Sequence, residues 1–461
     1  MALAFYIAMI PKLNYPYPVH IDEWVHVAHT NALLQAGGLN YLDPFTGGSG
    51  VGLVTTLESG FHVLFGIFYR ISGMSWMDIV RYLPSLVFVF TALSVYVLAR
   101  RGGFGWEAAL FTCLIPTTVG IMGPAFFIPL ALCLPFIPLS LLLVFNYRTF
   151  WSYLILLIFM CFLIITHATS AICFIIILTP CVLLYLVKEW KHGLILLLMG
   201  IVPFLITLPW TYDTIASTVR SLPVPQPLPS NIDLPMILRT YGYIPFILGL
   251  LGAFYLAFKG GVKNYSLVLG LLSTVAMLAI FYTLHYGVDH VYFRGIHYAL
   301  LMLGIVAGAS LMTIQNIKLP DILHLPKFSR KIGYPLCLAI IIIVLMIGIP
   351  ARLRTPYYHM IDEEDYQAFV WIRDNVDASY QKAMLDPWKA TPFTAITGKY
   401  TYARTHMAPT DLTRSADKFL ADNCTDTELL IKNNISLVYT PGECDNPDLE
   451  KIHDGVYLKL N

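Results

Sequence analysis

Long apolar runs alternate with short polar connections through the first three quarters of the chain. An α-helix needs about 20 mostly apolar residues to cross the roughly 30 Å hydrocarbon core of a bilayer. By that criterion the predicted membrane spans are Asp78–Leu98, Trp106–Met122, Phe127–Phe145, Trp151–Thr166, Ser170–Val187, Leu194–Trp210, Tyr241–Phe258, Tyr265–Leu284, Gly295–Gln315 and Ile332–Ile349. With a shorter apolar run at the start, the pattern predicts about eleven transmembrane helices.

That first run, Ala2–Ile10, covers only about 14 Å as a helix. Either the span is completed by Pro11–Tyr17, or the native chain starts upstream of Met1. A cleaved signal peptide is not indicated, because a basic first segment and a small-residue cleavage site are both missing.

Composition supports a polytopic membrane protein. Hydrophobic residues make up 57% of the chain and charged residues 12%, whereas soluble proteins carry about 25% charged residues. The net charge of +1 and the lack of a basic run argue against a nucleic-acid partner. The predicted spans carry few ionisable residues, and Asp78, Arg81 and Glu107 stand near span ends. A coupled transporter is therefore disfavoured, since its ion pathway needs charge at bilayer depth.

Basic residues fall on alternate connections, which predicts the orientation of the chain. These residues are Arg100, Arg101, Arg148, Lys188, Lys191, Lys259, Lys263, Lys318, Lys327, Arg330 and Lys331. The positive-inside rule puts these connections in the cytoplasm. We therefore expect a multi-pass protein of the cell membrane, with the loop 12–77 and the C-terminal region extracytoplasmic.

The composition turns polar and acidic after residue 351. Helical periodicity marks Asp362–Asn375 and Leu412–Asp422, and strands are predicted at Met384–Trp388, Ser436–Tyr439 and Gly455–Leu460. The sequence thus predicts an all-α membrane bundle (1–351) followed by a small extracytoplasmic α/β domain (352–461). Cys424 and Cys444 lie in that domain and are either a disulfide or two free thiols.

An acidic pair beside several histidines stands out in the predicted outer loop, within Pro18–Gln35. Asp22, His26 and His29 are spaced i, i+4, i+7, which puts them on one face of a helix, with Glu23 beside them. This face is either the polar side of an interfacial helix or part of a reaction site.

Three segments of this loop resemble the first outer loop of the GT-C superfamily of glycosyltransferases. They are Asp22-Glu23-Trp24-Val25-His26, Gly38-Leu39-Asn40-Tyr41-Leu42-Asp43-Pro44 and Gly60-Phe61-His62-Val63-Leu64-Phe65. The superfamily includes protein O-mannosyltransferases, aminoarabinose transferases and archaeal membrane glycosyltransferases. The resemblance implies a polyprenyl-phosphate sugar as donor and a glycan, lipid or protein as acceptor.

The resemblance also implies roles for the acidic pair. Asp22 would be the general base that deprotonates the acceptor hydroxyl during an inverting displacement, and Glu23 would orient the acceptor. Partial desolvation near a bilayer raises the basicity of a carboxylate, which suits this role. His26 and His29 are candidates for substrate binding. Asp22, Glu23 and His26, with His29 nearby, could also hold a divalent Mg or Mn ion, although several members of the superfamily work without a metal.

Further candidates for substrate binding lie elsewhere in the chain. Arg294 resembles the arginine that such enzymes present to the lipid phosphate, with His290 beside it; the alternative is an interfacial anchor. His167 lies in a tight connection, Thr166–Ser170, that either faces the site or caps a helix. Glu58 and His62, spaced i, i+4, are either an ion pair or substrate contacts.

Two other functions remain open. A glycolipid flippase or transporter predicts internal repeats and charged pairs within the membrane, and neither is visible in the sequence. A scaffold whose tail binds a partner would leave the acidic pair without a role. The Trp-Trp-Asp-Tyr-Gly motif of oligosaccharyltransferases is missing, the nearest segment being Asp386–Lys389, so transfer of a whole oligosaccharide to asparagine is disfavoured.

Overall fold

The computed structural model describes every residue except 49–56, 222–233, 285–288, 319–331, 406–408 and 461. The chain forms two compact units. Unit 1 comprises Met1–Leu13, Thr56–Phe61 and Arg81–Pro356, and unit 2 comprises Asn14–Thr55, His62–Val80 and Tyr357–Asn461. The predicted outer loop thus belongs mostly to the same unit as the C-terminal region. This division differs from the predicted domains, which were 1–351 and 352–461.

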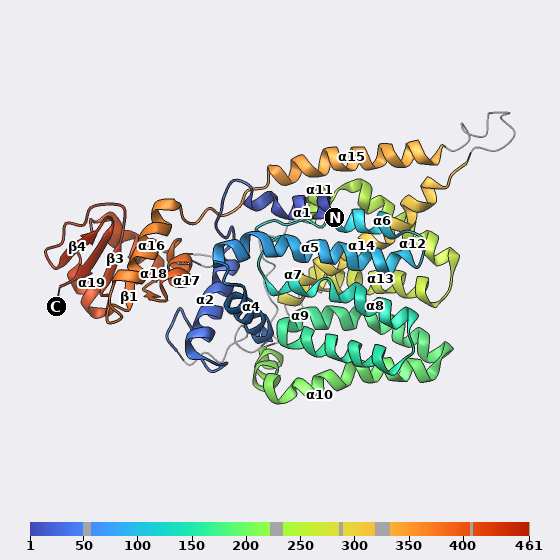
Figure 1. Cartoon of the computed structure of the whole chain (residues 1–461), viewed down its shortest axis with the longest axis horizontal. Coiled ribbons are helices and arrows are strands. Elements are labelled where there is room, and N and C mark those ends of the chain that lie inside the picture. Colours follow the sequence, from blue (N-terminus) through green and yellow to red (C-terminus); the bar gives the residue numbers. More distant parts are fainter. Residues whose placement is uncertain (49–56, 222–233, 285–288, 319–331, 406–408, 461) are drawn as a thin grey trace. The chain divides into compact units, whose positions relative to one another are not determined.

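Unit 1 is built from helices (Figure 1). They are α1 (Ala2–Met9), η1 (Ile10–Lys12), most of α5 (Trp76–Arg100), α6 (Gly105–Thr112), α7 (Pro129–Cys133), α8 (Phe136–Asn146), α9 (Phe150–Lys188), α10 (Trp190–Ser221), α11 (Leu234–Tyr241), α12 (Tyr243–Lys259), α13 (Val262–Leu284), α14 (Asp289–Gln315) and α15 (Gly333–Leu353). Among the described residues, 7 helices are long and apolar enough to cross a membrane, and Ala2–Lys12 and Tyr243–Lys259 are shorter apolar helices. The predicted count of about eleven is not confirmed.

The predicted span Trp106–Met122 is wrong. Its helix, α6, ends at Thr112, and the chain then runs irregularly to Ile128. Two helix breakers explain the difference, because Pro116 lacks an amide donor and Gly123 lies in close contact with the backbone. A Cβ on Gly123 would lie 2.1 Å from the carbonyl oxygen of Pro116, so only glycine fits there.

The predicted pair of spans on either side of Thr166–Ser170 is confirmed as a helical hairpin within α9. Helical geometry breaks at His167, where φ is −163° and ψ is 88°. The two ends of α9 lie side by side. Nε of Arg148 is 3.5 Å from Oε2 of Glu189, and the Tyr153 hydroxyl is 2.7 Å from Nδ1 of His192. Since Arg148 precedes α9 and Glu189 follows it, the chain must reverse direction between them.

Helix α14 is the centre of unit 1, with 94% of its most apolar window buried. Glycines allow its neighbours to approach closely, as small residues do in membrane bundles. A Cβ on Gly252 of α12 would lie 2.1 Å from the carbonyl oxygen of Val306, and one on Gly308 would lie 2.4 Å from the amide nitrogen of Ala108 in α6.

Contacts bring several of the basic connections together at one end of unit 1. Arg101 donates to the Tyr147 hydroxyl (3.4 Å), and Lys263 donates to Oδ1 of Asn146 (2.8 Å). Arg148 and Glu189 join the same group of helix ends. The connections that follow α5, α8, α9 and α12 therefore share one end, which we call the basic end.

Unit 2 combines loop helices with a five-stranded sheet. The loop provides α2 (Ile21–Ala36) and most of α4 (Ser59–Ser72); the C-terminal region provides α16 (Glu363–Asn375), β1 (Lys382–Met384), α17 (Ala390–Thr397), β2 (Tyr400–Thr401), α18 (Asp411–Ala421), α19 (Thr427–Lys432), β3 (Leu437–Tyr439), β4 (Leu449–His453) and β5 (Val456–Lys459). The strand order is β2-β1-β3-β5-β4, parallel from β2 to β3 and antiparallel beyond, with helices packed around the sheet (Figure 1).

Most elements predicted for the C-terminal region are confirmed, namely α16, α18, β3 and β5. The predicted strand Met384–Trp388 is mostly wrong, because β1 ends at Met384. Asp386 begins a turn there by accepting the Trp388 amide hydrogen at 2.9 Å. The elements β2, β4, α17 and α19 were not predicted.

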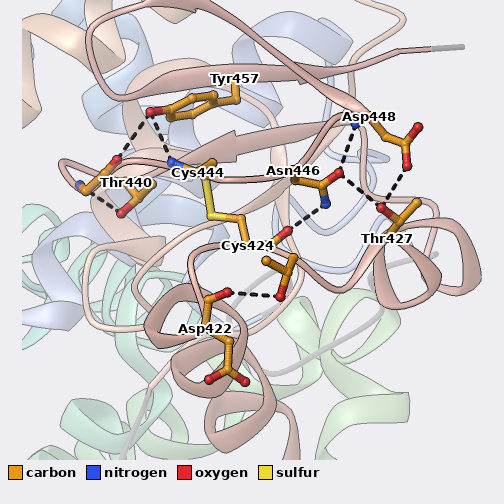
Figure 2. The surroundings of a disulfide bond; sticks show 10 residues. Asp422, Cys424, Thr427, Thr440, Cys444, Asn446, Asp448 and Tyr457 are labelled. Carbon is orange, nitrogen blue, oxygen red and sulfur yellow. Dashed lines mark hydrogen bonds between the residues drawn. A yellow bond between two sulfur atoms is a disulfide. The ribbon is translucent and has the colours of Figure 1, made fainter.

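The sequence left open whether Cys424 and Cys444 form a disulfide or remain free thiols. In the structure they form a disulfide. Figure 2 shows the polar contacts around it. Asn446 donates to the carbonyl oxygen of Cys424 (2.6 Å), and Thr427 donates to Oδ1 of Asn446 (3.1 Å). Cys424 is fully buried in the core beside Phe419 and Tyr457, so the bridge fixes the loop after β3 to this core.

Candidate active site

Asp22 lies in the first turn of α2. His20 is the N-cap, and its Nδ1 accepts the amide hydrogen of Asp22 at 3.1 Å. Negative charge is stabilised at this position because the helix dipole is positive at its N-terminus. The side chain of Asp22 is 24% exposed, with Oδ1 at 3.8 Å from Nδ1 of His20. This carboxylate is therefore held in place and remains accessible.

Glu23 differs from its neighbour, because its side chain is fully buried. Its Oε2 accepts the amide hydrogen of Val19 at 2.8 Å. The carbonyl oxygen of Val19 in turn accepts the amide hydrogen of Tyr358, at 3.1 Å. Glu23 thus fixes the segment that enters α2 onto the segment that precedes α16. The acidic pair consists of one accessible carboxylate and one buried carboxylate with a structural contact.

Three predicted histidines form a buried cluster, with His26 and His29 on α2 and His62 on α4. Nδ1 of His26 lies 3.2 Å from Nε2 of His62, and the rings of His29 and His62 stack with centroids 5.6 Å apart. His29 also contacts the Tyr41 hydroxyl at 3.1 Å. Burial lowers the pKa of His29 to about 4 and holds the pKa of His62 well below its usual range. Both rings are therefore neutral near pH 7.

Two charged residues of unit 2 that were not among the predicted site residues flank this cluster. The Arg404 guanidinium lies 4.3 Å from the centroid of the Phe45 ring, and Phe45 packs edge-on against His29. Burial lowers the pKa of Arg404, and the nearby carboxylate of Asp43 raises it. Asp43 also accepts the amide hydrogen of Phe45 at 2.8 Å. Asp43 lies in a segment that carries the family resemblance, whereas the sequence offers no signal for Arg404.

The remaining candidates lie in unit 1. His167, at the break in α9, hydrogen-bonds through Nδ1 to the hydroxyl of Ser170, which also accepts the Tyr298 hydroxyl hydrogen. All three side chains are buried. Arg294 lies one helical turn before Tyr298 on α14 and is partly buried. The break in α9 is thus linked to the helix that carries Arg294.

Glu58 and His290 complete the predicted set. Glu58 directly precedes α4, whose Gly60 packs against the break in α9, since a Cβ there would lie 2.7 Å from Oγ1 of Thr166. His290 lies in the first turn of α14, and its side chain is outside the described part of the structure. His62, which was predicted to pair with Glu58 or to contact substrate, contacts His26 through its Nε2.

The predicted metal ligands do not fit a metal site. Within the described residues, no group of three His, Cys, Asp or Glu side chains is placed to hold a metal ion. Glu23 is engaged with the Val19 amide and His26 with His62, so the set Asp22, Glu23 and His26 does not converge.

Comparison with known proteins gives a fold. No family model and no curated protein matches the chain. Among solved structures, the apo oligosaccharyltransferase of Archaeoglobus fulgidus is 12% identical, with a TM-score of 0.59 over 95% of this chain and 69% of that one. Apo ArnT from Cupriavidus metallidurans is 14% identical, with a TM-score of 0.55 over 95% of this chain and 91% of that one. The chain has the GT-C fold.

Other structures with the GT-C fold match the chain to a similar degree. ArnT from Cupriavidus metallidurans bound to undecaprenyl phosphate is 14% identical, with a TM-score of 0.52 over 96% of this chain and 94% of that one. The GT-C fold and the 7 long apolar helices make the chain a multi-pass membrane protein. Sequence identities this low establish the fold alone.

Proposed function

We propose that this protein is an integral membrane glycosyltransferase. It transfers a sugar from a polyprenyl-phosphate-linked donor to an acceptor hydroxyl at the outer face of the membrane, with inversion at the anomeric carbon. The GT-C fold supports this general kind of reaction, since structures with this fold include ArnT bound to undecaprenyl phosphate and the A. fulgidus oligosaccharyltransferase AglB in complex with dolichol-phosphate. The observation that carries the proposal is the accessible carboxylate of Asp22, fixed at the start of a buried helix.

Asp22 acts as the general base of the proposed reaction. It takes the proton of the acceptor hydroxyl while that oxygen attacks the anomeric carbon of the donor. The bond between the anomeric carbon and the phosphate oxygen breaks in the same step, so the products are the glycosylated acceptor and polyprenyl phosphate. The proton then passes from Asp22 to solvent. A positioned base of this kind contributes about 10²- to 10⁴-fold to the rate.

Arg294 binds the phosphate of the donor and stabilises the negative charge that develops on it as the bond breaks. A guanidinium suits this role because its forked N–H donors match phosphate oxygens. His290, His167 and Glu58 are proposed to contact the substrates. The hydrogen bonds between His167, Ser170 and Tyr298 keep the end of α14 in place for that purpose.

The buried side chains of unit 2 hold Asp22 in position. Glu23 fixes the entry to α2 through Val19, and the contact between His26 and His62 anchors the next turn of the helix on α4. His29 extends the same packing to Tyr41.

The disulfide supports the proposed location at the outer face. Disulfides form and persist in oxidising compartments and are rare in the cytosol. Cys424 and Cys444 therefore favour an extracytoplasmic C-terminal region, in agreement with the orientation predicted from the basic connections.

Sugar transfer in reconstituted vesicles tests the proposal. The purified protein is supplied with a panel of labelled polyprenyl-phosphate sugars and a membrane extract as acceptor. We expect transfer from at least one donor, and a loss of about 100-fold or more in the Asp22→Asn variant. Asp374→Asn, which removes an exposed carboxylate paired only with Arg373 in the described structure, is the matched control and should transfer normally.

Two results would count against the proposal. Equal transfer by Asp22→Asn and wild type would remove Asp22 from the mechanism. Movement of intact lipid-linked sugar across the vesicle membrane without transfer would favour the alternative, a glycolipid flippase.

A further inference from the structure

A cavity of about 310 Å³ opens at the basic end of unit 1, away from the residues assigned above. It lies where α5, α8 and α12 end and α13 begins. Its walls include three cations, Arg101, Lys259 and Lys263, and no residue that lines it is acidic. Such a cavity favours an anionic ligand.

A pair of glycines shapes this cavity. Gly260 has φ of 70° and ψ of −178°, and Gly261 has φ of +91°, conformations that side chains other than glycine rarely adopt. The tight turn between α12 and α13 places Lys259 and Lys263 around the same space. The N-terminus of α13 lines it too and adds the positive end of a helix dipole.

The described partners of these cations are neutral. Lys263 donates to the amide oxygen of Asn146 (2.8 Å), and Arg101 donates to the Tyr147 hydroxyl (3.4 Å). The ammonium of Lys259 lies 5.8 Å from the centroid of the Tyr255 ring. Within the described residues, no carboxylate forms a salt bridge with any of the three cations. Their mutual repulsion is therefore relieved when an anion enters.

Aromatic side chains indicate that this end lies at headgroup level. Tyr147, Trp151 and Trp190, which precede or begin α9 and α10, are all exposed, as is Tyr265 in the first turn of α13. Trp and Tyr collect where a membrane meets water, since their rings are apolar and their edges polar. The cavity is bounded by the same helix ends.

We propose that this cavity binds the phosphate of an anionic phospholipid from the leaflet at the basic end. Arg101, Lys259 and Lys263 surround the phosphate, and the amides of Asn146 and Asn264 accept or donate hydrogen bonds to the polar headgroup. Basic pockets between membrane helices bind anionic headgroups in this way. The lipid joins the ends of α5, α8, α12 and α13, where the described side-chain hydrogen bonds are those of Arg101 with Tyr147 and of Lys263 with Asn146. This inference is independent of the proposed sugar transfer.

Lipid binding to the full-length protein tests the inference. The protein is placed in nanodiscs of phosphatidylcholine, phosphatidylglycerol is titrated in, and retained lipid is measured by native mass spectrometry. The Lys259→Gln/Lys263→Gln variant should bind phosphatidylglycerol on the order of tenfold more weakly than wild type, since each cation near a membrane surface contributes appreciably. The control Lys188→Gln/Lys191→Gln removes the same charge from the same end outside the cavity and should bind normally.

A second variant tests the shape of the cavity rather than its charge. Gly260→Ala keeps all three cations, but its added Cβ meets a strained backbone and the Tyr265 hydroxyl at 3.3 Å. It should also weaken phosphatidylglycerol binding, while thermal unfolding in pure phosphatidylcholine confirms that each variant is folded.

Three outcomes would overturn the inference. Equal weakening in the cavity variant and its control would show general surface attraction, and unchanged binding in both would show that the cavity is not used. Displacement of phosphatidylglycerol by millimolar inorganic phosphate would show a site for the free anion instead of a lipid. Persistence of the lipid against phosphate, with selectivity over phosphatidylcholine, supports it.

Discussion

At the scale of single residues, the buried histidines make the stability of unit 2 depend on pH. The pKa of His29 is lowered by burial to about 4 in the folded chain, whereas an unfolded histidine titrates near 6.5. The unfolded chain therefore binds more protons between these values. The contribution of His29 to the free energy of unfolding is fully present above about pH 6.5. It is lost as the pH falls towards 4, which lowers that free energy by about 3 kcal/mol. His62 adds to it in the same direction.

Thermal unfolding at about pH 7.5 and about pH 5 measures this dependence. The melting temperature of wild type should fall as the pH is lowered. His29→Gln can keep a hydrogen bond to Tyr41 but does not titrate, so its melting temperature should fall less. A drop of the same size in both proteins would show that His29 is not responsible.

Glu23 offers a second residue-scale prediction. Its buried carboxylate holds the amide of Val19, and an amide side chain can accept the same hydrogen bond. Glu23→Gln should therefore keep most of the stability and sugar transfer, whereas Glu23→Ala leaves a buried N–H unpaired at a cost of about 1–3 kcal/mol. Melting temperatures and transfer rates separate the two variants. If Glu23→Gln folds normally but loses transfer as Asp22→Asn does, its charge takes part in the chemistry.

At the scale of elements, close packing of α12 against α14 depends on glycine. A Cβ on Gly252 would lie 2.1 Å from the carbonyl oxygen of Val306, so a larger side chain must push the helices apart. Gly252→Leu should lower the free energy of unfolding by about 3 kcal/mol or prevent folded expression. Gly200→Leu in α10 is the control, because a Cβ there meets nothing within 4 Å. Fluorescence-detected size exclusion measures the amount of folded protein for each variant. Similar profiles for Gly252→Leu and Gly200→Leu would contradict the packing argument.

The hydrophobic pattern predicted most elements, because the length of an apolar run and its periodicity can be read from neighbouring residues alone. The break in α9 followed from the polar residues around His167, and α16 and α18 followed from their helical periodicity. The segment after α6 is mostly apolar, so hydrophobicity alone predicted a span there, and Pro116 and Gly123 were the local signals against it. The strands β2 and β4 are short and largely outside the core, so their sequences carry little alternation.

At the scale of the whole molecule, the contacts that complete the candidate site come from distant parts of the chain. The spacing of Asp22, His26 and His29 predicted a common helical face, but it gave no partner for His26, which His62 provides 36 residues later. Nor could it show that α2 packs on α17, where Asn31 donates to the carbonyl oxygen of Ala395 across 364 residues. Local pattern carries no information on such pairings, which depend on the complementarity of folded surfaces.

The orientation of the protein in the membrane is the prediction that all these roles share. Asp411 and Lys263 are both exposed in the structure, the first on α18 and the second at the basic end. Positive-inside bias predicts that Lys263 lies in the cytoplasm, and the disulfide favours an oxidising compartment for the region that contains Asp411. The free cysteines are buried or half-buried, so background labelling should be low. In intact cells a membrane-impermeant maleimide should therefore label Asp411→Cys, and it should label Lys263→Cys only after permeabilisation. The reverse pattern would put the disulfide-bonded region in the cytosol and would be incompatible with sugar transfer at the outer face.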